Sequence, residues 1–180
     1  MRVVLIRHPR PLIEPGVCYG RLDIPLHPSG EDDIARIAAD PGLKGATRVW
    51  SSPARRCRAL ADAVADGLAV PLTVDHRLLE LDFGDWEGRP WDAVARADLD
   101  RWAAEPITFA PPGGESGAAL IARIRDFAEA LRLDRLDCAV VSHGGPLKVL
   151  AALLTGEPVD LLAPAPPVGG VQDVSLSSVR

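Results

Sequence analysis

The order of apolar segments along the chain predicts an α/β protein built in three layers, with a mostly parallel sheet between two layers of helices. Three observations lead to this prediction. Short, β-branched apolar runs at 2–7, 47–51 and 137–142 are typical of buried strands. Stretches with helical spacing of apolar residues separate these runs, as in parallel sheets. A final alternating run at 171–179 has the pattern of an edge strand, which we expect to be antiparallel.

The first half of the chain is predicted to contain two strand and helix pairs. Residues 2–7 (RVVLIR) form the first strand, and a loop rich in Pro and Gly follows it. Ser29 is the expected N-cap of a helix over 30–40, because its hydroxyl can accept a hydrogen bond from a free backbone amide. After the strand at 47–51, a helix over 53–67 begins with Pro, which is tolerated in a first turn.

The second half repeats the alternation around one strongly apolar strand. In order, the expected elements are a strand at 70–74, a loop at 77–89, helices at 90–104 and 116–132, a strand at 137–142 and a helix at 146–155. The strand DCAVVS is almost wholly apolar, which is typical of a parallel strand that is buried on both faces. A His-Gly-Gly turn ends it.

Length, composition and charge exclude several classes of protein. The chain has 180 residues, 47% hydrophobic and 25% charged, which suits one globular domain over 1–180. Its net charge of −5 argues against general binding to nucleic acid or anionic membranes. No run reaches the ~18 apolar residues of a membrane span, and the first apolar run is too short for a signal peptide. We therefore expect a cytoplasmic location, and reduced, buried thiols at the three widely spaced cysteines.

Chemically active residues follow the predicted strands. Ligands of open α/β sheets bind beyond the carboxyl ends of the strands. Arg7 and His8 follow the first strand, Ser51-Ser52 ends the second, and Ser142-His143 ends the later one. Arg55, Arg56 and Arg58 lie in the first turns of the helix that follows Ser51-Ser52. We expect all of these residues to meet at one edge of the sheet.

The residue types at this edge suit the transfer of a phosphoryl group. Two histidines, several arginines and the helix start at Gly144-Gly145 favour binding of a dianion. In such a site, a neutral imidazole nitrogen attacks phosphorus and arginines neutralise the oxygens. An acid then protonates the leaving alcohol. Glu80, in the intervening loop, is the candidate acid, and Asp82 is its rival.

Each candidate also has a structural interpretation. His8 could be a histidine that merely ends a strand, and Glu80 could be a surface acid. Arg55 and Arg58 are expected to be solvated helix residues, and His27 and His76 to be surface or loop residues. No pair of histidines has the spacing of metal ligands, so a metallohydrolase is not favoured.

Motifs along nearly the whole chain, in order, resemble those of the histidine phosphatase superfamily, also called the phosphoglycerate-mutase-like family. The matching segments are LIRH at 5–8, YGRLDIPLHPSG at 19–30, SSPARRCRALA at 51–61, LLELDFGDWEG at 78–88, PGGES at 112–116 and VVSHGG at 140–145. The resemblance implies a phosphoglycerate-mutase-like fold and a phosphatase that needs no metal or other cofactor.

The resemblance also implies roles for individual residues. His8 would be the nucleophile that becomes phosphohistidine, and Glu80 would donate the proton to the leaving group. The residues implied to hold the phosphoryl oxygens are Arg7, Arg56, His143 and Gly144. Arg56 is preferred to its neighbours because it lies five places after the first Ser of the matching segment.

The chain departs from the family pattern directly after His8. Pro9 stands where the family usually has Gly, so the amide of this residue cannot contact phosphate. The Asn that often occurs early in the following loop has no clear match. Arg10 or Arg21 is a candidate to replace its contact, and Trp86 is a further candidate for the rim of the substrate pocket.

The favoured function is hydrolysis of a small-molecule phosphate monoester, with no nucleic-acid or membrane partner. The loop CYGRLDIPL resembles that of alpha-ribazole phosphatases, which act late in cobalamin biosynthesis. A phosphoglycerate mutase is the first alternative, but such enzymes are longer. A non-catalytic module that binds phosphorylated ligands is the second. The sequence predicts neither an oligomeric state nor whether the Pro-rich segment 158–170 closes the pocket, contacts a partner or crosses the surface.

Overall fold

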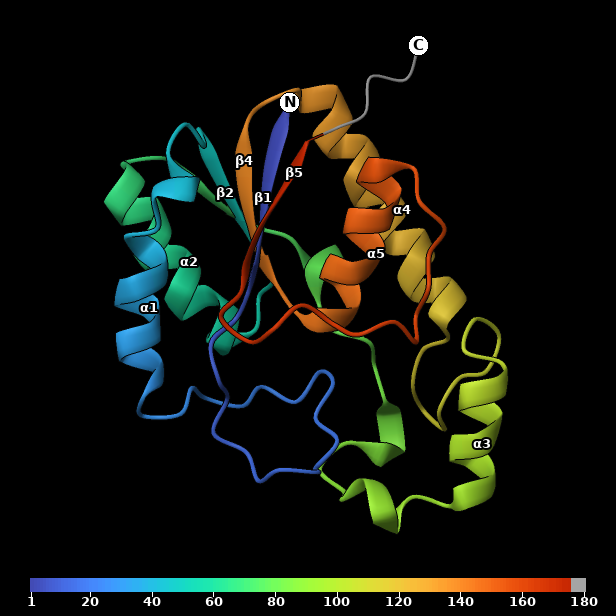
Figure 1. Cartoon of the computed structure of the whole chain (residues 1–180). Coiled ribbons are helices and arrows are strands. Elements are labelled where there is room, and N and C mark those ends of the chain that lie inside the picture. Colours follow the sequence, from blue (N-terminus) through green and yellow to red (C-terminus); the bar gives the residue numbers. More distant parts are fainter. Residues whose placement is uncertain (176–180) are drawn as a thin grey trace.

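The computed structural model describes residues 1–175, and a five-stranded sheet forms its centre (Figure 1). The strands are β1 (Arg2–Arg7), β2 (Arg48–Ser51), β3 (Leu72–Val74), β4 (Cys138–Ser142) and β5 (Val171–Ser175). Their order across the sheet is β3-β2-β4-β1-β5. All neighbouring pairs are parallel except β1 and β5, which are antiparallel. The predicted α/β sheet with an antiparallel edge strand is confirmed, although positions 176–179 of that predicted strand lie outside the described residues.

Helices cover both faces of the sheet (Figure 1). They are α1 (Gly30–Ala38), α2 (Arg55–Leu68), α3 (Arg96–Ala104), α4 (Gly117–Asp134) and α5 (Gly144–Thr155). Helices α1 and α2 pack on one face and α4 and α5 on the other, so the predicted three layers are present. Helix α3 lies beyond the end of the sheet (Figure 1). No helix within residues 1–175 has the length and apolar character required to cross a membrane.

Strand β1 shows why its sequence is continuously apolar. Side chains alternate between the two faces of a strand. Val3 and Leu5 therefore join the core under α4 and α5, whereas Val4 and Ile6 join the core under α1 and α2. Each of these four side chains is at most 1% exposed. The strand is thus buried on both sides, as is usual for parallel sheets.

Some predicted helix boundaries are wrong. The predicted helix over 90–104 is divided into a 3₁₀ turn at Trp91–Ala93 and helix α3. Val94 and Ala95 between them have extended backbone, which lets Val94 pack, 5% exposed, in a small cluster around Trp86. Tertiary packing therefore overrides the helical pattern here. Further 3₁₀ turns are Pro41–Leu43, His76–Leu78 and Gly84–Trp86, and the last of these lies within the loop predicted over 77–89.

The starts of three other helices differ in detail from the prediction. Ser29 precedes α1, but its hydroxyl contacts Nδ1 of His27 at 2.8 Å and makes no capping hydrogen bond. Helix α2 begins at Arg55, two residues after Pro53. Helix α5 begins at Gly144 instead of position 146. The three cysteines are free and buried, as expected.

Two leucines of α4 test the contribution of the core. Leu131 is 1% exposed and belongs to the core under α4 and α5, whereas Leu133 is 84% exposed. Leu131→Ala should lower the free energy of unfolding by about 2–5 kcal/mol, because it leaves a cavity. The same change at Leu133 should alter it by less than about 0.5 kcal/mol. Denaturant unfolding measures both values, and similar losses in the two variants would contradict this description of the core.

Candidate active site

His8 and His143 are brought together by the pairing of β1 with β4. These strands run parallel, with Arg7 opposite Ser142. The residue that follows each strand is a histidine, so the two rings leave the sheet side by side. Their centroids are 5.1 Å apart and their planes are inclined by 66°. Both side chains are almost completely buried, with 1% and 0% exposed.

The backbone around His8 fixes the position of the proton on its ring. The His8 amide donates to the carbonyl of Ser142 at 3.0 Å. Nδ1 of His8 lies 2.7 Å from the carbonyl oxygen of Pro9. A carbonyl only accepts hydrogen bonds, so Nδ1 carries the proton and Nε2 keeps its lone pair. Pro9 therefore lacks an amide for phosphate but supplies the acceptor that orients the imidazole.

The ring of His143 is held at both nitrogens. Nδ1 lies 3.2 Å from Nη2 of Arg56, and Nε2 lies 2.8 Å from the hydroxyl of Ser52. A guanidinium only donates hydrogen bonds, so Nδ1 is the acceptor and Nε2 carries the proton. The thiol of Cys57 lies 3.6 Å from Nε2 and closes the remaining space. His143 is thus fixed in one orientation beside His8.

Burial keeps both imidazoles neutral. Burial lowers the pKa of His8 to about 3, although the hydrogen bond to Pro9 partly opposes this change. The positive charges of Arg56 and Arg7 lower it further. The pKa of His143 is held well below its usual range by burial, then by the charge of Arg56. A neutral His8 with a free Nε2 can act as a nucleophile at neutral pH.

Backbone carbonyls hold the two arginines beside these rings. Arg56 is fully buried, and its guanidinium donates to the carbonyls of Leu22 at 2.7 Å and Gly20 at 2.8 Å. Arg7 donates to the carbonyl of Pro166 at 2.6 Å. The ring of Tyr19 lies 5.4 Å from the Arg56 guanidinium carbon. The loop after β1 and the Pro-rich segment 158–170 therefore each fasten one arginine at the site.

The start of α5 needs glycine at two positions. A Cβ atom on Gly144 would lie 2.9 Å from Cβ of Ala165 and 3.3 Å from the guanidinium carbon of Arg7. A Cβ atom on Gly145 would collide with a carboxylate oxygen of Glu80. The Gly145 amide donates to Glu80 Oε2 at 3.2 Å. One of the amides expected to bind an anion at this helix start is therefore occupied by Glu80.

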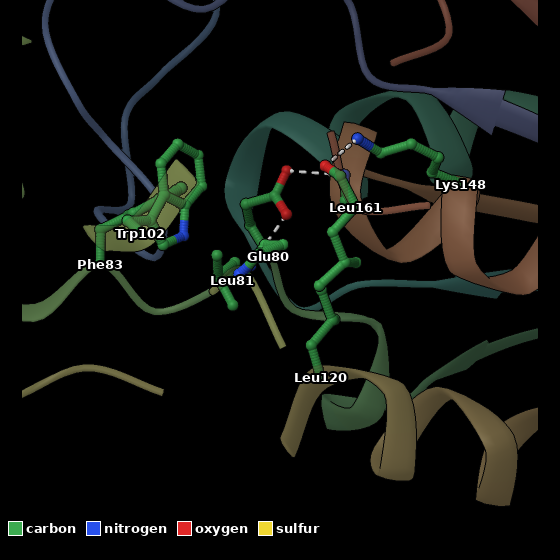
Figure 2. Close-up of a pocket in the computed structure, with 9 residues that line it drawn as sticks. Glu80, Leu81, Phe83, Trp102, Leu120, Lys148 and Leu161 are labelled. Carbon is green, nitrogen blue, oxygen red and sulfur yellow. Dashed lines mark hydrogen bonds between the residues drawn. The ribbon is translucent and has the colours of Figure 1, made fainter. Parts of the chain in front are cut away.

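Glu80 lies where the sequence predicts an acid, against the helix that follows His143 (Figure 2). Its other oxygen, Oε1, accepts from the Leu81 amide at 2.8 Å. Its main-chain carbonyl accepts from Arg123 at 3.0 Å and Arg21 at 3.3 Å. The carboxylate is held by backbone amides, and its loop is held by two arginines.

A network of charged residues under Glu80 was not predicted. Glu115 accepts from Arg123 at 2.6 Å and from Arg21 at 3.0 Å. Arg21 also contacts Asp82 at 3.2 Å. The segments 78–88 and 112–116, both singled out in the sequence, therefore support one another. Asp82, the rival proton donor, binds Arg21 and makes no contact with Gly145 in the described residues.

Of the predicted rim residues, Arg21 alone contacts Glu80 in the described residues, through the main-chain carbonyl. Arg10 is exposed and lines a separate cavity of about 430 Å³ with Leu12 and His27. The side chain of Arg21 is engaged by the network just described. Trp86 is only 2% exposed and stacks on Phe109 at 6.0 Å, so it is a core residue here and not a rim residue.

The remaining predictions concern surface residues. Arg55 and His76 are exposed, and His27 is half-buried in the loop before α1. Arg58 pairs with Asp62 at 3.0 Å on the outside of α2. None of these four residues contacts His8 or His143 in the described part of the chain, as expected for surface and loop residues. Ser52 and Cys57 contact His143. Both lie in the family-like segment 51–61, but the sequence predicted no role for either side chain.

The chain resembles named phosphatases along most of its length. It is 33% identical over 160 residues to a Hydrogenobacter thermophilus protein provisionally named phosphoserine phosphatase 2, covering 86% of this chain and 79% of the relative. It is 29% identical to the glucosyl-3-phosphoglycerate phosphatase of Mycolicibacterium vanbaalenii, covering 97% of this chain and 81% of the relative.

A solved structure shows the same fold. The alpha-ribazole phosphatase of Shigella flexneri superposes with a TM-score of 0.88 over 99% of this chain and 92% of its own, at 24% identity. At this identity the likeness concerns the fold alone. The family model of the histidine phosphatase superfamily (branch 1) matches residues 3–177. The chain therefore belongs to the histidine phosphatase superfamily, and it is a phosphatase.

Proposed function

We propose that this protein hydrolyses small-molecule phosphate monoesters through a phosphohistidine on His8. One observation supports this most strongly: a buried, neutral imidazole with a free Nε2 lies beside a second imidazole and two arginines. These groups suit a phosphoryl dianion.

The described strands belong to one sheet, so we also propose a single domain over the whole chain. A cytoplasmic location stays a prediction.

The first step forms the phosphohistidine. The lone pair on Nε2 of His8 attacks phosphorus, and the bond from phosphorus to the ester oxygen breaks. Glu80 gives its proton to that oxygen, so the alcohol leaves neutral. Arg7 and Arg56 neutralise the oxygens of the phosphoryl group. His143, whose two ring nitrogens are held by Arg56 and Ser52, helps to keep the Arg56 guanidinium in place.

The second step releases phosphate. Water attacks phosphorus, and the carboxylate of Glu80 accepts the water proton. The bond from phosphorus to Nε2 breaks and returns the lone pair to His8. Glu80 keeps the proton that it took from water and is ready for the next cycle. Atoms and charge balance over the cycle: one ester and one water yield one alcohol and one phosphate.

Hydrolysis is favoured over the mutase alternative because both relatives described above are named phosphatases. For the specific substrate we propose alpha-ribazole 5′-phosphate, on the resemblance of the loop at 18–26. That loop contributes the carbonyls of Gly20 and Leu22 that hold Arg56, so its sequence is tied to the site. Phosphoserine and glucosyl-3-phosphoglycerate belong in the same substrate panel.

Replacing His8 tests the nucleophile. Hydrolysis of p-nitrophenyl phosphate should be insensitive to EDTA and should fall at least about a thousandfold in His8→Ala. His76→Ala, on the surface, should keep the activity of the parent protein. Acid-labile, base-stable labelling by a phosphate donor should also disappear only in the His8 variant. Near-normal activity in His8→Ala would refute the assignment.

Replacing Glu80 tests the proton donor. An alkyl leaving group needs a proton, whereas p-nitrophenolate needs none. Glu80→Gln should therefore lower kcat/KM for glycerol 3-phosphate by about 10²–10⁴-fold and that for p-nitrophenyl phosphate much less. Asp82→Asn should show no such dependence on the leaving group. Equal losses on both substrates in Glu80→Gln would remove Glu80 from the acid role.

The neutral state of His8 has a consequence for stability. The pKa of His8 is about 3 when folded and near 6.5 when unfolded, so below pH 6.5 the unfolded chain binds the extra proton. Lowering the pH from 6 to 4 should therefore reduce the free energy of unfolding, and His8 should contribute about 1.4 kcal/mol of this loss per pH unit. This contribution should vanish in His8→Asn and persist in His76→Asn. Denaturant unfolding in phosphate-free buffer measures it, and parallel profiles for the parent protein and His8→Asn would exclude it.

A further inference from the structure

A cavity of about 150 Å³ lies directly against Glu80 (Figure 2). Glu80 and Gly145 form part of its wall, so it begins where the carboxylate meets the start of α5. The rest of the wall is mainly apolar and comes from distant parts of the chain. The apolar lining residues are Leu81, Phe83, Trp102, Pro106, Leu120 and Leu161.

The position of this cavity assigns it to the alcohol part of the substrate. The proposed proton donor must lie at the ester oxygen, which joins phosphorus to the alcohol. The phosphoryl group faces His8 in this mechanism, and the alcohol lies at the carboxylate of Glu80. The alcohol is then next to a cavity that the same carboxylate lines.

Lys148 also lines the cavity, and it holds the neighbouring part of the wall in place. Its ammonium group donates to the carbonyls of Leu161 at 2.6 Å and Ala163 at 2.7 Å. On its other side, Leu161 packs so closely on Gly117 that a Cβ atom there would collide with it. Leu161 is therefore fixed between α4 and α5, and the cavity has a defined size.

Size and polarity indicate the kind of alcohol. An apolar cavity of about 150 Å³ is large enough for one benzene-sized ring. Burying such a ring against Phe83 and Trp102 is favourable, whereas a hydroxyl-rich alcohol would lose its hydration there. A carboxylate on the alcohol would need the Lys148 ammonium group as its cationic partner. That group already donates hydrogen bonds to two backbone carbonyls.

We infer that the site prefers phosphate monoesters whose alcohol carries a single apolar ring next to the ester oxygen. The inference rests on the phosphohistidine chemistry of the proposed function. It disfavours alpha-ribazole 5′-phosphate, whose ester oxygen is attached to a hydroxyl-rich ribose, so hydrolysis of that ester in the substrate panel decides between the two. Leu161 is then a specificity-determining residue, and Lys148 is a positioning residue that acts through it.

Two alkyl esters of similar leaving-group acidity test the preference. The parent protein should hydrolyse benzyl phosphate with a kcat/KM at least about tenfold above that for glycerol 3-phosphate. Phosphoserine tests the alternative of a carboxylate bound by Lys148. Equal values for benzyl phosphate and glycerol 3-phosphate, or a preference for phosphoserine, would overturn the inference.

Leu161 and its neighbour provide a matched pair of variants. Leu161→Ala enlarges the cavity, so the ratio of kcat/KM for 2-naphthylmethyl phosphate to that for benzyl phosphate should rise about tenfold. Leu162 is 51% exposed and does not line the cavity, so Leu162→Ala should leave this ratio unchanged. An unchanged ratio in Leu161→Ala, with the variant shown to be folded, would contradict the assignment.

Two controls separate this inference from the proposed function. If hydrolysis of both esters survives in His8→Ala, the phosphohistidine mechanism fails, whatever the preference. Benzylphosphonate and 2-hydroxyethylphosphonate cannot be hydrolysed, so calorimetry with them tests the cavity without turnover. Tighter binding of benzylphosphonate, reduced in Leu161→Ala and not in Leu162→Ala, supports the cavity assignment. Equal binding of the two phosphonates refutes it.

Discussion

The parallel pairing of β1 with β4 is the constraint on which the rest of the site depends. It sets Arg7 opposite Ser142, so the residues that follow the two strands are neighbours. Those residues are the two histidines, separated by 135 positions in the chain yet 5.1 Å apart between ring centroids. A slip of one residue in this register would turn each side chain to the opposite face. Because β1 packs apolar side chains into a core on each face, such a slip would require both cores to repack.

The sequence was sufficient to predict the sheet and the site positions at its edge. Apolar runs identify strands that are buried on both faces, and strand ends in a parallel sheet converge by topology. His8, His143 and Arg7 could be identified from their place at a strand end. Arg56 needed the family resemblance to separate it from Arg55 and Arg58. Glu80 needed the family resemblance as well, because it lies in a loop without a periodic pattern.

Other features depended on contacts that no local pattern encodes. The hydrogen bond from His8 to the carbonyl of Pro9 depends on ring orientation, so the sequence revealed only that an amide was missing. Trp86 was a rim candidate because it lies in a family motif, but its ring packs in a cluster with Val94 and Phe109. The division of the predicted helix at 90–104 has the same cause. In each case, long-range packing decided the outcome.

The site arginines and the supporting arginines have different partners. Arg21 and Arg123 are paired with carboxylates, whereas Arg7 and Arg56 are held by uncharged carbonyls, and no carboxylate within residues 1–175 forms an ion pair with either. Two full positive charges thus converge in a poorly hydrated space, at an electrostatic cost to the unliganded fold. Any tetrahedral oxyanion of suitable size relieves this repulsion. Sulfate, vanadate and the product itself should therefore act both as competitive inhibitors and as thermal stabilisers.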